Sequence, residues 1–436
     1  MKYTNKQAEC IKYIQEGKNV FVTGMSGTGK SAIIKIIPKL LKRKKVIVTS
    51  TTGTSSILIK GVTLHSYLGL GLGRKNVDDL AFKILSKSWL KKRWLQIETL
   101  VIDEISMLSP ELFDKIEELA RRVRKSSLIF GGIQIILSGD FLQLPTIGCS
   151  SQFCFESLNW DKAIDKSIYL TEIIRQRDLK FQTCLNKIRL GIVDTYVKSM
   201  LDSRINAVLD TKIIPTKLYS TNFHVNRENE IALDKLTKDG KLFYSYDMNI
   251  TYTVKSNAAK NFIFNKIQKN SSLSEELILC KNAQVMLVKN IDIENGLANG
   301  SQGVVVGFTE DPIRPIVKFK NGQTHIIDKE LWEIEELGKK IATIRQIPLK
   351  LSYALSIHRS QGVTLDFAQI DLRNIFEYGM AYVALSRLKS LDGLTITGID
   401  YDSIRANPKA VSFYEKLSRS ASGSQIRAKR SSARKL

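Results

Sequence analysis

The fold is decided by the stretch Asn19–Ser31, NVFVTGMSGTGKS. Residues 19–23 are an apolar run typical of a buried strand, and residues 24–31 fit the pattern G-x-x-x-x-G-K-[ST]. The segment from Ser31 to Lys42 then repeats isoleucine and leucine at helical spacing, with Pro38 among them. A strand, a glycine-rich turn and a helix in this order predict a phosphate-binding loop.

The chemistry of this loop depends on its backbone and on two side chains. Glycines allow backbone N–H groups to surround the phosphates, and the N-terminus of the following helix favours negative charge. The predicted contacts within the turn are Gly24, Gly27, Thr28 and Gly29. Lys30 is expected to reach the β- and γ-phosphates, and the hydroxyl of Ser31 is expected to bind Mg²⁺. ATP and Mg²⁺ are therefore the expected cofactors.

Two carboxylates follow a second apolar strand, in the sequence TLVIDE at residues 99–104. Asp103 is predicted to hold Mg²⁺, and Glu104 to orient and activate the attacking water. A strand followed by an ordinary acidic loop is the alternative, but the phosphate loop upstream favours hydrolysis. A third strand end, SGDFLQLP at residues 138–145, places Gln143 where it would sense the γ-phosphate.

The order of elements predicts an α/β fold. Further strands are expected at 46–50, 100–103 and 133–138, with a helix at 111–124. Apolar strands that alternate with helices favour a parallel sheet covered by helices, with ligands at the carboxyl ends of its strands. A second α/β region begins near Lys166. The sequence pattern changes between 277 and 344, where short runs of alternating apolar and polar residues separated by turn signals predict a small antiparallel β module.

Composition narrows the class of partner. The 66 Lys and Arg residues exceed the 43 Asp and Glu residues by 23, which favours a polyanion, although a lysine-rich proteome would give the same excess. The five cysteines are dispersed without a CxxC pair, and with only four histidines they are expected to be free thiols rather than metal ligands. The sequence lacks an apolar run of about 18 residues and a secretory signal, so we expect an intracellular protein without a membrane partner. The choice between nucleus and cytoplasm stays open.

Seven motifs in order resemble those of a known family. They are GMSGTGKS, DEISM, FGGIQ, GDFLQLP, LTEIIRQ, SIHRSQGVT and YVALSR, and the resemblance runs from about residue 4 to residue 407. The chain resembles the superfamily-one DNA helicases of the petite-integration-frequency (PIF) family, relatives of the RecD motor. The resemblance implies two RecA-like domains, ATP-driven translocation from 5′ to 3′ on single-stranded DNA, and unwinding of forked duplexes. It also implies roles in DNA replication, repair, recombination and telomere maintenance. We expect a monomer in isolation, although the sequence does not reveal the oligomeric state.

The same resemblance assigns roles that the chemistry alone does not. Gln7 matches a residue that recognises adenine, and Arg175 and Arg387 match arginines that reach the γ-phosphate. The DNA contacts implied by the resemblance are Thr52, Gly53, Thr63, His65, His358 and Ser360.

Sequence patterns, composition and the resemblance together give the expected domain limits. These are 1–165 with a small wedge insertion near 67–96, 166–276 together with 345–417, a β-barrel at 277–344, and a disordered basic tail at 418–436. The segment KSWLKKRW at 87–94 falls in the wedge, where Trp89 and Trp94 would either stack on DNA or pack inside an amphipathic helix.

The chain departs from the family pattern at three positions. Met380 stands where the family usually has glutamine, and Thr146 and Ile129 each stand where it usually has proline. None of the three positions holds a residue that hydrolysis requires. Two other functions stay open at this point. One is a DNA-stimulated ATPase that translocates or remodels without unwinding, and the other is a non-catalytic protein that coats DNA. An RNA motor is a weaker variant, since no motif reads a 2′-hydroxyl.

Overall fold

The computed structural model describes residues 3–52, 55–56, 59–71, 73–145, 152–176, 178–209, 215–238, 242–270, 273–289, 291–292, 297, 301–319, 322–336 and 339–419. The chain forms two compact units, residues 1–210 with 360–436, and residues 211–359. No helix of the described residues is long and apolar enough to cross a membrane.

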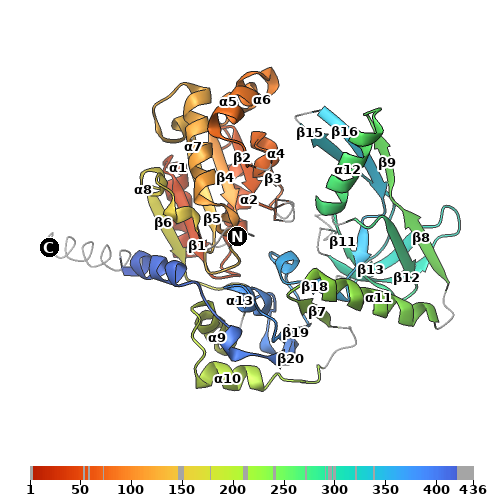
Figure 1. Cartoon of the computed structure of the whole chain (residues 1–436). Helices are drawn as coiled ribbons and strands as arrows, with labels where there is room; N and C mark the ends of the chain where they lie inside the picture. The colour runs from red at the N-terminus through yellow and green to blue at the C-terminus, as the bar shows by residue number, and fades with distance from the viewer. Residues whose placement is uncertain are drawn as a thin grey trace. The chain divides into compact units, whose positions relative to one another are not determined.

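The first unit is built on a six-stranded parallel sheet (Figure 1). In chain order the strands are β1 (Val20–Gly24), β2 (Val46–Ser50), β3 (Val62–Thr63), β4 (Thr99–Asp103), β5 (Gln134–Gly139) and β6 (Lys166–Leu170). They lie in the order β3-β2-β4-β5-β1-β6, and every neighbouring pair is parallel. The predicted α/β class is confirmed.

Alternation along the strands divides the apolar side chains between the two faces of the sheet. Val20 and Val22 of β1 pack with α1 (Asn5–Gln15) and α2 (Lys30–Leu40), whereas Phe21 faces the opposite layer. That layer includes α7 (Pro110–Arg124), and Leu100 and Ile102 of β4 point into it. Because both faces are covered, the central strands are buried along their whole length.

Three short helices follow β3. They are α4 (Leu64–Leu68), α5 (Val77–Leu85) and α6 (Ser88–Gln96). The Trp94 ring of α6 is completely buried, and its Nε1 donates to the Leu68 carbonyl at 3.1 Å. Trp89 is half-buried, and the Arg93 guanidinium lies 5.0 Å from the centre of its ring. The segment forms a helix in which Trp94 belongs to the core, as the amphipathic interpretation expects, and its role in stacking on DNA stays a prediction.

The rest of the first unit carries α8 (Trp160–Ala163), α9 (Leu179–Arg189), α10 (Thr195–Asp202), α13 (Met380–Leu385), and the parallel pair β19 (Ala368–Leu372) and β20 (Leu394–Ile399). A last helix, 408–419, returns to the first sheet. Its Phe413 stacks on Phe155 with 4.3 Å between ring centres, next to Phe141 and Trp160. Residues from opposite ends of the sequence therefore share one aromatic core.

The second unit is mainly antiparallel. Strands β11 (Gln284–Leu287), β12 (Gln302–Phe308), β13 (Pro315–Phe319), β14 (Thr324–Ile326) and β17 (Leu349–Leu351) form one sheet in the order β14-β13-β12-β11-β17. A second sheet contains β9 (Asn249–Tyr252), β15 (Glu330–Glu336) and β16 (Lys339–Gln346), and a third pairs β8 (Phe243–Asp247) with β10 (Glu276–Cys280). This unit also holds α11 (Asn222–Lys238), α12 (Asn257–Asn270) and the parallel strands β7 (Thr216–Tyr219) and β18 (Ala354–Ser356).

The antiparallel region is wider than the predicted limits of 277 and 344. Strands β8 and β9 precede the predicted module in sequence, and β17 follows it. All three belong to the antiparallel region, because each pairs with a strand of the predicted module. Cys10, Cys154, Cys184 and Cys280 are buried free thiols, as predicted. Among the described residues no group of three or more His, Cys, Asp or Glu side chains is arranged to hold a metal ion. The predicted tail beyond residue 419 lies outside the described residues.

Candidate functional site

The phosphate loop joins β1 to α2, and its backbone requires glycine. Gly29 has φ +87°, and a Cβ there would lie 2.6 Å from Gln7 Nε2. Gly27 has φ +86°, and a Cβ there would lie 2.6 Å from the Cβ of Arg175. Positive φ is strained for residues with a side chain, and these close approaches leave no room for one. The glycines predicted from sequence therefore lie where the backbone needs them.

Lys30 opens α2 and bends back over the loop. Its Nζ donates to the carbonyl oxygens of Gly24 and Met25, at 2.7 and 2.9 Å. Burial lowers the pKa of Lys30, and three nearby carboxylates oppose that shift. The carboxylates belong to Asp140, Glu104 and Asp103. The ammonium group is thus held among acceptors that a phosphate would replace.

Asp103 and Glu104 lie at the carboxyl end of β4. Asp103 is 5% exposed, and Glu104 follows it in the left-handed backbone region, with φ 55°. Burial, together with the Asp103 charge, raises the pKa of Glu104 to about 7. Carboxylate and hydroxyl oxygens are the ligands that Mg²⁺ prefers, so Asp103 and Ser31 fit this ion by chemistry.

Gln361 joins the Glu104 carboxylate to Gln143. Gln361 Nε2 donates to Glu104 Oε2 at 3.0 Å and to Gln143 Oε1 at 3.3 Å. Both glutamines are 6% exposed. Gln143 was predicted as part of the site, but Gln361 was expected only as a member of a DNA-contacting motif. The structure places the Gln361 side chain at the nucleotide end of the sheet.

The two predicted arginines meet at one hydroxyl of the phosphate loop. Arg175 Nη1 donates to Ser26 Oγ at 2.8 Å, and Arg387 Nη2 donates to the same atom at 2.9 Å. The Arg387 side chain is buried and that of Arg175 is partly buried, and burial together with the Arg175 charge lowers the pKa of Arg387 to about 9. The hydroxyl of Tyr382 accepts from Ser26 N at 2.8 Å. Two cations lie at the loop, and no carboxylate of the described residues is bonded to either of them, so the site suits an anion.

Gln7 lies against the same loop. Its Nε2 donates to the Thr28 carbonyl at 3.2 Å, and its Oε1 accepts from Thr4 N at 3.1 Å. Thr4 Oγ1 in turn accepts from Gln7 N at 3.3 Å, which completes a capping box at the start of α1. Gln7 therefore ties α1 to the phosphate loop, beside the position predicted for a nucleotide.

A buried ion pair lies behind the loop and was missed by the sequence analysis. Arg189 donates to both carboxylate oxygens of Asp140, at 2.9 and 2.8 Å, and the two side chains are 1% and 0% exposed. The Arg189 guanidinium lies 4.6 Å from the centre of the Tyr414 ring. The Tyr414 hydroxyl is 2.6 Å from Thr23 Oγ1 and accepts from Phe141 N at 3.1 Å.

The predicted DNA contacts do not form one cluster in a single unit. Thr52 follows β2, where its hydroxyl accepts from Ser55 N at 3.2 Å, and Thr63 ends the neighbouring strand β3. His65 lies on α4, and burial lowers the pKa of its ring. Ser360 is completely buried in the first unit, which leaves its side chain poorly exposed for DNA. His358 belongs to the second unit, and Gly53 lies outside the described residues.

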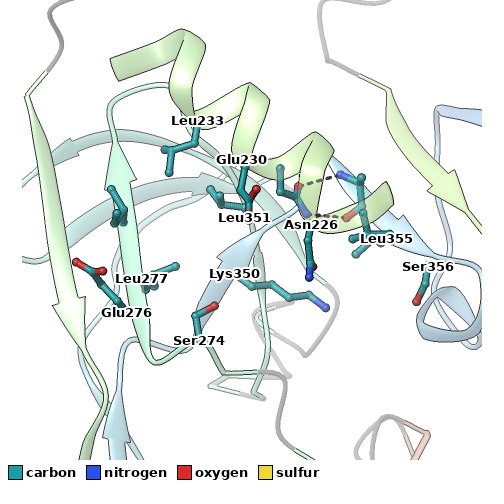
Figure 2. A pocket seen from close by; sticks show the side chains of 14 residues that line it. Asn226, Glu230, Leu233, Ser274, Glu276, Leu277, Lys350, Leu351, Leu355 and Ser356 are labelled. Atoms are coloured by element: carbon teal, nitrogen blue, oxygen red, sulfur yellow. Dashed lines mark hydrogen bonds between the residues drawn. The ribbon is translucent and has the colours of Figure 1, made fainter. Parts of the chain in front are cut away.

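The second unit has a cavity of about 430 Å³ of its own. Figure 2 shows its lining: α11 supplies Asn226, Glu230 and Leu233, and Lys350 and Leu351 come from β17. Asn229 Nδ2 donates to the Ala354 carbonyl at 3.3 Å. Glu230 and Glu276 lie on its wall and would repel a phosphate backbone. None of the predicted site residues lines this cavity.

Comparison with sequence families gives two matches. The family described as PIF1-like helicase matches residues 2–205, and the domain described as DNA helicase Pif1, 2B domain, matches residues 263–308. The first match contains the phosphate loop, the two carboxylates and Arg175. The second lies within the antiparallel region of the second unit.

Individual proteins match over nearly the whole chain. The uncharacterized protein 030L of Invertebrate iridescent virus 6 is 37% identical, over 95% of this chain and 94% of its own. The ATP-dependent DNA helicase PIF1 of Xenopus laevis is 36% identical over 96% of this chain, which spans 65% of that helicase. The crystal structure of the Pif1 helicase from Candida albicans superposes with a TM-score of 0.85 and 33% identity, over 96% of this chain and 100% of that one.

Proposed function

This chain belongs to the PIF1-like helicase family, and on that premise we propose that it is an ATP-dependent DNA helicase. The observation that carries the proposal is the convergence of Lys30, Glu104 and two arginines at one end of the parallel sheet. These side chains come from four separate parts of the sequence. Together they supply a phosphate contact, a water-activating carboxylate and cationic stabilisation of the departing phosphates.

Nucleotide binding would begin at the phosphate loop. Lys30 would exchange its two loop carbonyls for phosphate oxygens, while backbone N–H groups of the loop surround the phosphates. Mg²⁺ would be held by Ser31, Asp103 and the nucleotide, and it would offset phosphate charge. Gln7, which already contacts Thr28, lies where it would receive the adenine base.

Hydrolysis would use the carboxylate of Glu104. As it accepts a proton from the attacking water, the bond between the water oxygen and the γ-phosphorus forms and the bond to the ADP oxygen breaks. Arg175 and Arg387 would leave Ser26 Oγ for the oxygens on which negative charge builds up. Gln143 would detect the presence of the γ-phosphate.

The proposed DNA contacts rest on the family resemblance. We propose that Thr52, Gly53, Thr63, His65, His358 and Ser360 belong to the segments that contact a single strand. Apart from the buried side chain of Ser360, their hydroxyl, imidazole and backbone groups suit phosphate and sugar contacts that are independent of sequence. Two RecA-like domains that close on ATP and open after hydrolysis would then step along the strand from 5′ to 3′.

Two substitutions test the nucleotide site. Lys30→Ala and Glu104→Gln should each abolish ATP turnover while single-strand binding, measured by fluorescence anisotropy, stays close to that of the unmodified chain. Lys12→Ala is a suitable control, because Lys12 is an exposed residue of α1 whose ammonium group lies 3.9 Å from the Glu16 carboxylate. Retained hydrolysis in both site variants would refute the assignment of the catalytic residues.

A further inference from the structure

The hydroxyl of Tyr414 joins two strand ends of the first sheet. It lies 2.6 Å from Thr23 Oγ1 and accepts from Phe141 N at 3.1 Å. Thr23 lies near the end of β1, directly before the phosphate loop. Phe141 lies two residues beyond the end of β5, in the turn that carries Gln143. One buried hydroxyl therefore touches both segments that lead into the nucleotide site.

This contact lies where the backbone pairing of the two strands ends. Thr23 and Gly139 are the last pair in the parallel register of β1 with β5. Beyond this pair the phosphate loop and the turn at 140–145 leave the sheet, so ladder hydrogen bonds no longer fix the distance between them. The Tyr414 hydroxyl supplies a link between the two segments at the point where the sheet stops supplying one.

The helix that carries Tyr414 is itself well anchored. The ring of Phe413, the preceding residue, stacks on that of Phe155 with 4.3 Å between their centres. The Tyr414 ring is 4.6 Å from the Arg189 guanidinium, which donates to both carboxylate oxygens of Asp140. The ring and the hydroxyl of Tyr414 thus both fix the start of the turn at 140–145.

Hydrolysis depends on the relative positions of these two segments. Lys30 of the phosphate loop would hold the phosphates, and Gln143 of the turn would sense the γ-phosphate. A misplacement of about 1 Å in a catalytic site can lower the rate about hundredfold. Binding of ATP depends mainly on Lys30 and the backbone N–H groups of the loop, which are adjacent in sequence. A weaker link between loop and turn should therefore lower turnover more than ATP binding.

We propose that Tyr414 is a positioning residue of the ATPase site, which holds the phosphate loop and the turn at 140–145 in the arrangement that hydrolysis requires. The proposal rests on the proposed function, since it requires a chain that hydrolyses ATP. Tyr414 acts through Thr23 and Phe141 and not on the nucleotide itself. Helix 408–419, far from the phosphate loop in sequence, thereby becomes part of the support of the nucleotide site.

The test is steady-state ATP hydrolysis in the presence of a single-stranded oligothymidylate, with kcat and KM measured separately. Tyr414→Phe keeps the ring but removes the hydroxyl, and Thr23→Val removes the partner hydroxyl at nearly the same volume. Each variant should lower kcat about tenfold and leave KM for ATP within about twofold. Thr23→Ser keeps a hydroxyl and should restore kcat. The double variant with Tyr414→Phe and Thr23→Val should be no slower than Tyr414→Phe, because both changes remove the same link.

Tyr353→Phe is the matched control. Tyr353 belongs to the second unit and is 6% exposed, as Tyr414 is. Its hydroxyl also accepts from a backbone N–H group, that of Gln284, at 2.9 Å. Loss of this hydroxyl should lower thermal stability without changing kcat. Circular dichroism at the assay temperature checks that each variant is folded.

The decisive result is the pattern of kcat across these variants. A lower kcat at unchanged KM in Tyr414→Phe and Thr23→Val, but not in Thr23→Ser or Tyr353→Phe, supports the positioning role. A folded Tyr414→Phe with the kcat of the unmodified chain overturns it, and so does an equal loss of kcat in Tyr353→Phe. If Tyr414→Phe does not fold, an unchanged kcat in Thr23→Val overturns the proposal. If the unmodified chain hydrolyses no ATP, the proposed function fails first, and this proposal with it.

Discussion

Replacing Arg189 by methionine should destabilise the first unit strongly. The substitution leaves Asp140 completely buried without the guanidinium that bonds both of its oxygens. Breaking a buried pair by removing one partner costs about 3–5 kcal/mol, since the remaining charge has lost its compensation. For a unit of this size that corresponds to a fall in Tm of roughly 6–20 °C.

The effect of pH on this loss has a definite sign. In the intact chain burial acts to raise the pKa of Asp140, but the Arg189 charge and its hydrogen bonds outweigh it and hold the pKa below the ordinary value. The pair therefore contributes stability above the unfolded pKa of about 3.9, and that stability is lost as the pH falls through the folded pKa. In Arg189→Met the Asp140 carboxyl can be protonated instead. The gap between variant and parent should therefore be largest near neutral pH and shrink in acid.

Thermal unfolding followed by tryptophan fluorescence measures this loss of stability directly. Trp160 is a suitable probe, because its ring lies 5.9 Å from that of Phe141, and Phe141 follows Asp140 in the sequence. The control is Arg122→Met. The Arg122 guanidinium pairs with Asp78 and Glu118 but is 42% exposed, so its loss should lower the Tm much less than the loss of Arg189. A loss in Arg189→Met no larger than in the control, or one independent of pH, would refute the reasoning.

Three further predictions concern packing and charge. Tyr414→Phe removes the hydroxyl next to Thr23 Oγ1 and the Phe141 amide, and should lower the free energy of unfolding by about 1–3 kcal/mol in urea titrations. An unchanged free energy of unfolding would show that helix 408–419 is held by its aromatic rings alone. Trp94→Ala should cost about 3–5 kcal/mol and Trp89→Ala clearly less, because only the Trp94 ring is completely buried; the reverse order in thermal unfolding would contradict the packing of α6. Residues 420–436 carry five basic side chains and no acidic side chain. Their removal should weaken single-strand binding more at low salt than at high salt, and an equal loss of affinity at both salt concentrations would exclude an electrostatic contribution.

Local patterns in the sequence were sufficient for most of the first unit. The predicted strand 46–50 has the limits of β2, and those at 100–103 and 133–138 agree with β4 and β5 to within one residue at each end. The phosphate loop was also predictable, because its glycines, lysine and serine are adjacent in sequence. These features depend on residues that are close together in the chain, where periodicity and turn chemistry are informative.

The contacts that were missed join distant parts of the chain. Arg189 lies 49 residues from Asp140, and Gln361 lies 257 residues from Glu104. Nothing in the local sequence of these residues distinguishes them from other polar residues, since their roles arise only when the chain folds. Strand β17 was missed as part of the antiparallel region for the same reason: its partner β11 is more than 60 residues away. The resemblance supplied Arg175 and Arg387, which residue chemistry alone did not separate from the many other basic side chains.

The most direct test of the central proposal is ATP-dependent strand release from two partial duplexes, one with a 5′ single-stranded overhang and one with a 3′ overhang. Release from the 5′ substrate alone, lost in Glu104→Gln, is the predicted result for a helicase that moves from 5′ to 3′. Release from neither substrate, with DNA-stimulated ATP hydrolysis intact, would contradict the proposal and indicate a translocase or remodelling ATPase instead.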